Sequence, residues 1–304
     1  MQPDLKGIKV AVLGGDAREI VLVSTLSRLG AYVKVLGLPI NSDPPHITIC
    51  GNLEEALADV QAVILPVPGL LEKGNIYCVY EDKPLVLTEA LLVKLPPQTP
   101  VFAGFARPKL KEIVQRSNLK LIQVLSLDEV AILNSIPSAE GAVQMAMENT
   151  AITIHNSKSF VLGFGRTGAS IARLLHGMGA RVTVVARSAA HRARVYEMGM
   201  EAVSFDELPD AIAKAEIIFN TVPKMVLTNC ILNKVKEDAV IIDVASPPGG
   251  TDFDAAARLS IKALLAPGLP GKVAPKTAGR ILAKVIPNLL AQELQRNDGT
   301  VGTA

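Results

Sequence analysis

The sequence has no tryptophan, and aromatic side chains make up only 4% of its 304 residues. Proteins that bind single-stranded nucleic acid stack bases on aromatic side chains, so this composition argues against that class. The formal net charge is +2, from 31 basic and 29 acidic residues that are spread along the chain. Because nucleic-acid-binding proteins usually carry a concentrated basic face, we predict no nucleic-acid partner.

Cysteine and long apolar runs are also scarce. Cys50, Cys78 and Cys230 are isolated, without a C-x-x-C pair or a histidine–cysteine cluster. We therefore predict no metal site and no disulfide framework, but small packing residues in a reducing compartment. No apolar run reaches the roughly 20 residues that span a bilayer, and the first residues lack the layout of a signal peptide. We expect a cytoplasmic protein with no membrane partner.

A glycine fingerprint stands in the second half of the chain. Gly163, Gly165 and Gly168 give G-x-G-x-x-G directly after an apolar run. Apolar periodicity predicts a helix over 169–178, and a second strand is predicted over 181–185. In this context the glycines permit a tight turn and a close approach of backbone to a pyrophosphate, whose charge the helix N-terminus stabilises. The alternative is a glycine-rich turn that binds no nucleotide.

Strand and helix patterns alternate on both sides of this fingerprint, with a helix expected over 85–93 and a strand over 119–125. Such alternation predicts parallel sheets covered by helices on both faces. We predict an α/β protein with two doubly wound, Rossmann-like domains, a connecting helix and a C-terminal return helix. The first domain has Asp16-Ala17-Arg18 where a nucleotide fingerprint needs more glycine, so we expect the second domain to bind the dinucleotide.

Turn and capping signals set the predicted boundaries. Ser138 is a good N-cap and begins a stretch of helical composition. The predicted parts are an N-terminal α/β substrate domain over 1–137, a connector helix over 138–157, a dinucleotide domain over 158–275, a C-terminal helix over 276–295 that packs back on the first domain, and a disordered tail over 296–304.

The residues that follow the strand predicted over 181–185 indicate whether the cofactor is NAD or NADP. A carboxylate there would bind the ribose of NAD, but the strand ends in Ala186, Arg187 and Ser188. Arg187 can pair with a 2′-phosphate and Ser188 can donate to it, so we predict NADP over NAD. The alternative for Arg187 is a solvated surface side chain.

Further cofactor contacts are expected from short loops at the carboxyl ends of later strands, where open α/β sheets bind ligands. Plain turn chemistry is the alternative explanation for these loops. The predicted cofactor-binding residues are Gly163, Phe164, Gly165, Arg166, Thr167, Gly168, Ala186, Arg187, Ser188, Asn220, Thr221, Val222, Pro223, Ala245, Ser246, Pro267, Gly268 and Leu269.

Five segments of the chain resemble the family of dipicolinate synthase A subunits. They are residues 14–18, 134–141, 163–168, 243–250 and 269–279. The resemblance implies an oxidoreductase that converts dihydrodipicolinate, or its hydrated precursor, to dipicolinate in the mother cell of spore-forming bacteria. It also implies a partner, the flavoprotein-like B subunit of dipicolinate synthase, and a homo-oligomer is a further option.

The implied reaction removes a hydride to NADP and a proton to a base, and a dicarboxylate substrate calls for cationic or N–H donors. For the proton acceptor we predict Asp16 or Glu140. For each of these side chains, a surface charge or a helix cap is the alternative. The predicted substrate-binding residues are Arg18, Arg107, Ser135, Ser138 and Lys272.

Two other functions stay open on the sequence. One is a different two-domain dehydrogenase, for an amino acid, a hydroxy acid or a methylene-folate. Hydroxy-acid enzymes usually carry a His–Glu pair in the cofactor domain, and here no histidine follows His191. The other is a non-catalytic protein that binds NADP and directs its partner, which would bind the cofactor without turnover.

Overall fold

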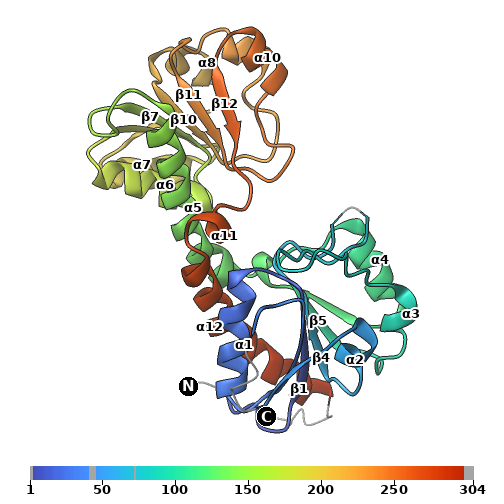
Figure 1. Cartoon of the computed structure of the whole chain (residues 1–304). Helices are drawn as coiled ribbons and strands as arrows, with labels where there is room; N and C mark the ends of the chain where they lie inside the picture. The colour runs from blue at the N-terminus through green and yellow to red at the C-terminus, as the bar shows by residue number, and fades with distance from the viewer. Residues whose placement is uncertain (1–2, 41–45, 72, 298–304) are drawn as a thin grey trace. The chain divides into compact units, whose positions relative to one another are not determined.

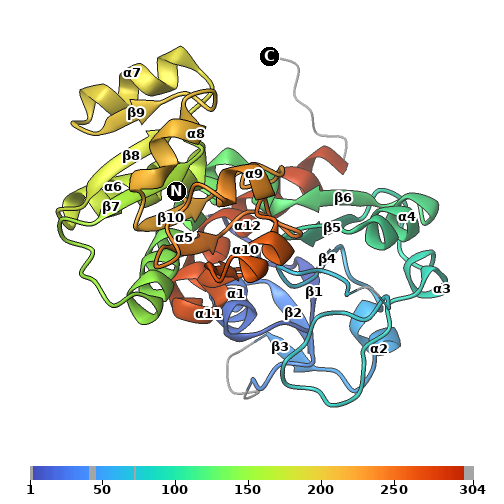
Figure 2. The same ribbon diagram turned by 90° about the horizontal axis from the view of Figure 1, so that it is seen from above.

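The computed structural model describes residues 3–40, 46–71 and 73–297. The chain divides into unit 1, Met1–Ala131 with Pro275–Ala304, and unit 2, Ile132–Ala274. Each unit contains a six-stranded parallel sheet with helices around it (Figures 1 and 2). The predicted α/β fold with two doubly wound sheets is confirmed. Within the described residues, no helix combines the length and the hydrophobicity needed to cross a bilayer.

Unit 1 has the strand order β3-β2-β1-β4-β5-β6. The order reverses between β1 and β4, the point beyond which open α/β sheets bind ligands. The strands are β1 (Lys9–Leu13), β2 (Tyr32–Leu36), β3 (Ile47–Ile49), β4 (Ala62–Ile64), β5 (Pro100–Ala103) and β6 (Lys120–Gln123). The helices are α1 (Ala17–Arg28), α2 (Leu53–Leu57), α3 (Glu89–Leu92), α4 (Pro108–Arg116) and α12 (Pro275–Asn297), with the 3-10 turn η1 (Val124–Ser126).

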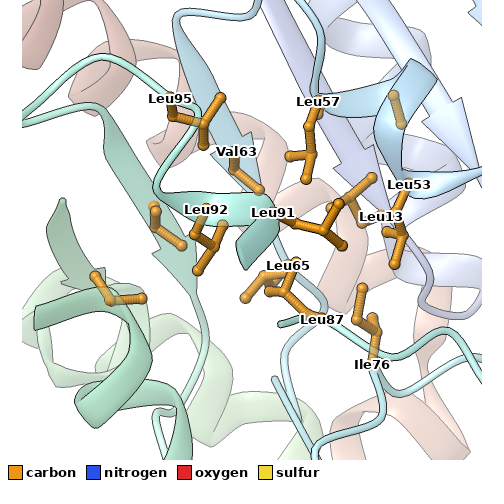
Figure 3. Packing of buried hydrophobic residues seen from close by; sticks show 14 of the residues in the cluster. Leu13, Leu53, Leu57, Val63, Leu65, Ile76, Leu87, Leu91, Leu92 and Leu95 are labelled. Atoms are coloured by element: carbon orange, nitrogen blue, oxygen red, sulfur yellow. The ribbon is translucent and has the colours of Figure 1, made fainter. Parts of the chain in front are cut away.

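Two apolar clusters cover the two faces of this sheet. Because successive strand residues point to opposite faces, Leu13 joins one cluster and its neighbour Val12 the other. In the first cluster, Leu57 of α2 and Leu92 of α3 gather over the sheet with Leu13 (Figure 3). Helices α1 and α12 cover the opposite face. Burial on both faces explains why the strands read as apolar runs in the sequence.

Helix α12 packs along α1 within unit 1 (Figure 1). The two backbones are closest at Gly279, where a Cβ would lie 2.8 Å from the Arg18 carbonyl oxygen and 2.9 Å from Val21 Cβ. Only glycine leaves room for this approach. The apolar side of α12 is buried against the sheet through Leu282, Ile286 and Leu290.

Unit 2 repeats this topology with the strand order β12-β11-β10-β7-β8-β9, which reverses between β7 and β10. Its strands are β7 (Lys158–Leu162), β8 (Arg181–Val185), β9 (Glu201–Val203), β10 (Ile217–Asn220), β11 (Val240–Asp243) and β12 (Lys262–Leu265). Its helices are α5 (Asp128–Asn149, which begins at the end of unit 1), α6 (Arg166–Gly177), α7 (Ala189–Glu197), α8 (Leu208–Ala211), α9 (Asn229–Leu232), α10 (Phe253–Arg258) and α11 (Leu269–Val273), with the 3-10 turn η2 (Ile212–Lys214).

Helix α5 corrects one prediction. It begins at Asp128, so Pro137 and Ser138 lie inside it, and the Ser138 hydroxyl donates to the Asn134 carbonyl at 2.9 Å. The predicted N-cap role of Ser138 is therefore wrong. A proline removes one helical hydrogen bond, which suggested a boundary. Burial of the apolar side of α5 outweighs that loss, through Ala139, Ala142, Val143 and Ala146.

Other differences concern element ends. The helix predicted over 85–93 is only α3, and the strand predicted over 119–125 ends at Gln123 and continues as η1. The sequence patterns did not predict β3, β9 or the short helices α2, α7, α8, α9, α10 and α11. Arg296 and Asn297 belong to α12, so the predicted tail begins too early. The rest of that predicted tail, 298–304, lies outside the described residues.

Candidate functional site

A cavity of about 740 Å³ lies at the carboxyl ends of the strands of unit 2. Its walls are the turn after β7, the end of β8 and the loops after β10 and β11. All the predicted cofactor residues line it except Asn220, Pro267, Gly268 and Leu269. Three residues that sequence reasoning missed also line it, namely His191, Phe205 and Val244.

The three fingerprint glycines have distinct roles in the turn. Gly163 has a φ of +95°, and a Cβ there would lie 2.6 Å from Thr221 Oγ1. A Cβ at Gly168 would lie 2.2 Å from the Gly163 carbonyl oxygen. At Gly165 no atom lies within 4 Å of the Cβ position. The first and third glycines are therefore required by the tight turn and its packing, while the second leaves backbone open to the cavity.

The N-terminus of α6 has no side-chain cap. Its N-cap is Gly165, which has no side chain that could accept from the first-turn N–H groups, and the first turn holds no acidic residue. The first N–H groups of a helix have no partner within the helix, and they carry partial positive charge. Residues 165–168 line the cavity, so this helix end is suited to bind an anion there.

The N-terminus of α1 in unit 1 is different, although the topology is the same. Asp16 Oδ1 accepts from the Arg18 backbone N–H at 3.0 Å, and Glu19 Oε2 accepts from the Asp16 N–H at 2.9 Å. The two carboxylates form a capping box and occupy the place that a phosphate would take. This helix end is therefore unfavourable for a pyrophosphate.

The end of the cavity near β8 carries cationic side chains. Arg187 is exposed, and within the described residues its side chain makes no hydrogen bond or ion pair. Arg192 Nη1 donates to the carbonyl oxygens of Ala186 and Arg187, at 2.9 and 2.7 Å. This contact fixes the strand end from which Arg187 projects. Among the described residues, no carboxylate lines the cavity, so its charge favours an anionic ligand.

Buried polar residues shape the two loops at the other end. Asn220 is fully buried; its Oδ1 accepts from the Val222 N–H at 3.0 Å. Asp243, also fully buried, accepts from the N–H groups of Ala245 at 3.1 Å and Gly250 at 2.9 Å. Asn220, predicted as a direct contact, instead orders the backbone of a loop that lines the cavity.

The last three predicted cofactor residues lie at the start of α11. Gly268 is its N-cap, with a φ of +70°, and Leu269 is buried in the core of unit 2. A Cβ on Gly141 of α5 would lie 3.1 Å from Leu269 Cβ. Leu269 therefore packs against α5, and none of Pro267, Gly268 and Leu269 lines the cavity.

The substrate residues predicted in unit 2 do not line the cavity either. The Ser135 hydroxyl donates to the Ile132 carbonyl and lies 2.6 Å from Ser170 Oγ, so it links α5 to α6. Glu140 is exposed beside Arg173 in a groove between the same two helices. Lys272 is exposed on α11. Their functional roles stay predictions.

In unit 1, Asp16 and Arg18 form a nearly buried ion pair. Arg18 Nε and Nη2 donate to the two Asp16 oxygens at 2.9 and 2.8 Å, and the Arg18 and Asp16 side chains are 8% and 14% exposed. Burial alone would raise the pKa of the Asp16 carboxyl, but the Arg18 hydrogen bonds outweigh burial and hold it below its ordinary value. Asp16 is therefore ionised and only weakly basic.

Arg107 is the N-cap residue of α4. Its Nη1 donates to the Leu70 carbonyl at 2.9 Å. Within the described residues Nε and Nη2 make no hydrogen bond, so one edge of the guanidinium is left for a carboxylate. In Arg18, by contrast, Nε and Nη2 already donate to the Asp16 carboxylate.

Sequence reasoning missed Glu19. Its side chain is buried, and it accepts from the backbone N–H groups of Asp16 at 2.9 Å and Val67 at 3.2 Å. Burial raises the pKa of this carboxyl from 4.5 to about 7, against the opposing effect of Arg18. The D-x-x-E spacing of Asp16 and Glu19 is the signal that could have identified it, because it is the pattern of a capping box.

Comparison with known proteins gives the family. Residues 9–125 match the family model for the N-terminal domain of the dipicolinate synthase A subunit. The chain is 40% identical to the dipicolinate synthase A subunit of Bacillus subtilis (strain 168) over 296 residues, 97% of this chain and 99% of that protein. This chain belongs to the family of dipicolinate synthase A subunits. The resemblance seen in the sequence is confirmed.

Solved structures agree with this family membership. The chain superposes on the dipicolinate synthase A subunit from Bacillus halodurans with a TM-score of 0.92 and 39% identity, over 95% of this chain and 99% of that one. For the Bacillus subtilis dipicolinate synthase A chain the TM-score is 0.90, with 40% identity over 96% and 98%. An L-alanine dehydrogenase, with a TM-score of 0.65 and 15% identity over 95% and 91%, shares the fold.

The cavity lies in a region with a match of its own. Residues 135–248 match the "D-isomer specific 2-hydroxyacid dehydrogenase, NAD binding domain" model, and this range contains the fingerprint and all the residues that line the cavity. The chain thus carries a nicotinamide-dinucleotide-binding dehydrogenase domain, in agreement with an oxidoreductase role.

Proposed function

We propose that this chain is an NADP-dependent oxidoreductase that converts dihydrodipicolinate, or its hydrated precursor, to dipicolinate. The observation that carries the proposal is the uncapped α6 N-terminus, at a cavity that no carboxylate lines among the described residues. Membership of the dipicolinate synthase A family supports the choice of dihydrodipicolinate, or its hydrated precursor, as the substrate. By the same resemblance, the protein acts in the cytoplasm of the mother cell of a spore former.

The residues of the cavity fit a dinucleotide. The backbone at Gly165 and the α6 N-terminus suit the pyrophosphate, and Arg187 with Ser188 suits a 2′-phosphate. The loops at 221–223 and 244–246 then border the nicotinamide end. When bound, the nicotinamide supplies the acceptor for the substrate's hydride. NAD is the alternative cofactor.

The tasks left to the chain are to bind two carboxylates and to accept one proton. Arg107 offers the free edge of its guanidinium, and Arg18 offers its remaining nitrogen. Lys272 and the backbone near Ser135 and Ser138 are further proposed contacts. Oxidation of a dihydropyridine releases one proton with the hydride, and Asp16 and Glu140 are the proposed acceptors. Formation of an aromatic product supplies the driving force.

The relatives are named as one subunit of dipicolinate synthase, which supports the existence of a second. We propose that the partner of this chain is a flavoprotein-like B subunit. A second candidate function, a non-catalytic role, also needs a test. Within unit 2, the proposed proton acceptor Glu140 does not line the cavity, which favours a non-catalytic protein that binds NADP and directs its partner.

One experiment separates the two functions. The purified chain, alone and with the B subunit, is incubated with freshly generated dihydrodipicolinate and NADP. Growth of the ultraviolet absorbance of the pyridine product supports the oxidoreductase. Cofactor binding without product under both conditions contradicts it and favours the non-catalytic role.

A further inference from the structure

A cluster of buried charges lies at the point of unit 1 where the strand order reverses. It follows β1 and touches the loop after β4, so it stands where open α/β sheets bind ligands. Its members are Asp16, Arg18 and Glu19, whose backbones form the first turn of α1. Buried charges are costly unless they are paired, and here two carboxylates share one guanidinium.

One guanidinium nitrogen of Arg18, Nη1, can still donate to a ligand. Nε and Nη2 are bound to Asp16, and among the described residues Nη1 makes no hydrogen bond. Asp16 therefore holds the guanidinium in one orientation, with Nη1 as the donor that is left. Only 8% of the side chain is exposed, so a ligand can contact Arg18 over only a small part of its surface. A carboxylate that docks there binds end-on to Nη1.

Glu19 is the group that would respond to such an anion. Both of its oxygens accept backbone N–H groups, one from the turn after β1 and one from Val67 after β4. The charges that act on it are Arg18 and Asp16, and the phenol of Tyr77 faces the same cluster. Helix α12 packs on α1 at Gly279, and its charged residues nearest in sequence to that contact are Lys276 and Arg280.

We propose that Asp16, Arg18 and Glu19 form a carboxylate receptor in which Glu19 takes up a proton as the ligand's carboxylate docks on Arg18 Nη1. The proton comes from solvent and converts the Glu19 carboxylate to the acid. That the ligand is a pyridine or dihydropyridine dicarboxylate rests on the proposed function. Glu19 is a positioning residue, since it does not touch the ligand.

Electrostatics gives the reason for the proton uptake. Without ligand, burial already raises the pKa of Glu19 to about 7, so the cluster changes between neutral and singly negative near neutral pH. A further anion within about 6 Å disfavours the charged form of a carboxyl and raises its pKa more. Binding and protonation of Glu19 are therefore linked. At pH 7 the linkage amounts to up to roughly half a proton per ligand bound.

Isothermal calorimetry with dipicolinate as the probe tests the proposal. The full chain is titrated at pH 7 in buffers of different ionisation enthalpy, and the slope of the binding enthalpy gives the protons taken up. We expect an uptake of up to about half a proton for the wild type and none for Glu19→Gln. Glu112→Gln, an exposed carboxylate on α4, serves as the matched control and should match the wild type.

The wild type alone also gives a test, should Glu19→Gln fail to fold. Its uptake should be largest between about pH 7 and 8 and approach zero near about pH 5.5, where Glu19 is already protonated. Binding without buffer-dependent heat, or unchanged uptake in Glu19→Gln, would overturn the receptor and leave the proposed function standing. Binding with proton uptake but no turnover would overturn the oxidoreductase alone. Absence of both binding and turnover would overturn both.

Discussion

At the residue scale, the proposed preference for NADP rests on Arg187. It projects from a strand end fixed by Arg192, in the place where an NAD enzyme would carry a carboxylate. Arg187→Glu should weaken NADP binding by roughly 10- to 100-fold, because one charge-assisted contact is lost and a repulsion is added. Binding of NAD should be unchanged or improved.

The measurement is calorimetric titration of both cofactors. Arg194→Glu is the control, because Arg194 lies on α7, the helix that follows Arg187, pairs with Glu197 and does not line the cavity. Equal losses for NADP and NAD would contradict the 2′-phosphate contact.

Glu19 makes a prediction about stability and pH. Its pKa is raised in the folded chain from 4.5 to about 7, so the folded state holds this proton more tightly than the unfolded state does. Stability from this group is complete below about pH 4.5 and is lost as the pH rises through about 7. The loss is roughly 3 kcal/mol, since one pKa unit corresponds to about 1.4 kcal/mol.

Urea denaturation of the wild type and Glu19→Gln over this pH range measures that loss. The stability of the wild type relative to the variant should fall as the pH rises. Parallel pH profiles for the two proteins would show that Glu19 does not titrate near neutrality.

Single residues were predictable where their role is local. The fingerprint glycines were predicted because a tight turn and an open backbone follow from the missing Cβ. The prediction for Ser138 was wrong because α5 buries its apolar side against residues distant in sequence, which overrides the local signal of Pro137. That Nη1 of Arg18 is left to donate to a ligand could not be predicted, because it depends on which guanidinium nitrogens donate to Asp16.

At the scale of elements, the contrast between α1 and α6 gives a physical reason for the proposed difference in function between two units of one topology. Helix α1 is closed by the carboxylates of Asp16 and Glu19, and α6 begins at the bare Gly165. Part of this contrast was predicted, because residues 16–18 lack the glycines of the fingerprint, but the D-x-x-E pattern of the α1 capping box was missed. The short elements β3 and β9 were not predicted, because three residues carry too little periodicity.

The contrast predicts the effect of Gly165→Asp. The site has room for a side chain and a φ of −84°, so aspartate fits and becomes an N-cap that changes stability by only a few tenths of a kcal/mol. Its carboxylate should take the first-turn N–H groups of α6 and repel the pyrophosphate. We expect roughly 100-fold weaker binding of both NADP and NAD, about 2.7 kcal/mol.

Gly177→Ala is the matched control for that variant. Gly177 lies in the same helix, also with no atom within 4 Å of its Cβ position, and it does not line the cavity. Alanine there should raise the melting temperature without a change in cofactor affinity. Wild-type affinity in Gly165→Asp, in a folded protein, would show that the phosphates do not bind at this helix end.

At the scale of the whole molecule, the chain is a member of the family of dipicolinate synthase A subunits, with two parallel-sheet units. The class of fold and the number of sheets were predictable, because alternating strand and helix patterns cover nearly the whole sequence. The proposed substrate residues are divided between the two units, with Arg18 and Arg107 in one and Lys272 in the other. The hydrogen bonds that Arg18 and Arg107 make could not be predicted from the sequence, because they depend on how the chain folds around each side chain.

The central claim is that the glycine turn of unit 2 binds a pyridine dinucleotide, with preference for the extra phosphate. Titration calorimetry of NADP and NAD into the full chain, with the melting temperature followed in parallel, tests it most directly. We predict saturable binding to one site, tighter for NADP. At 100 times its dissociation constant, NADP should stabilise the fold by about 2.7 kcal/mol. No heat and no change in melting temperature with either nucleotide would contradict the claim.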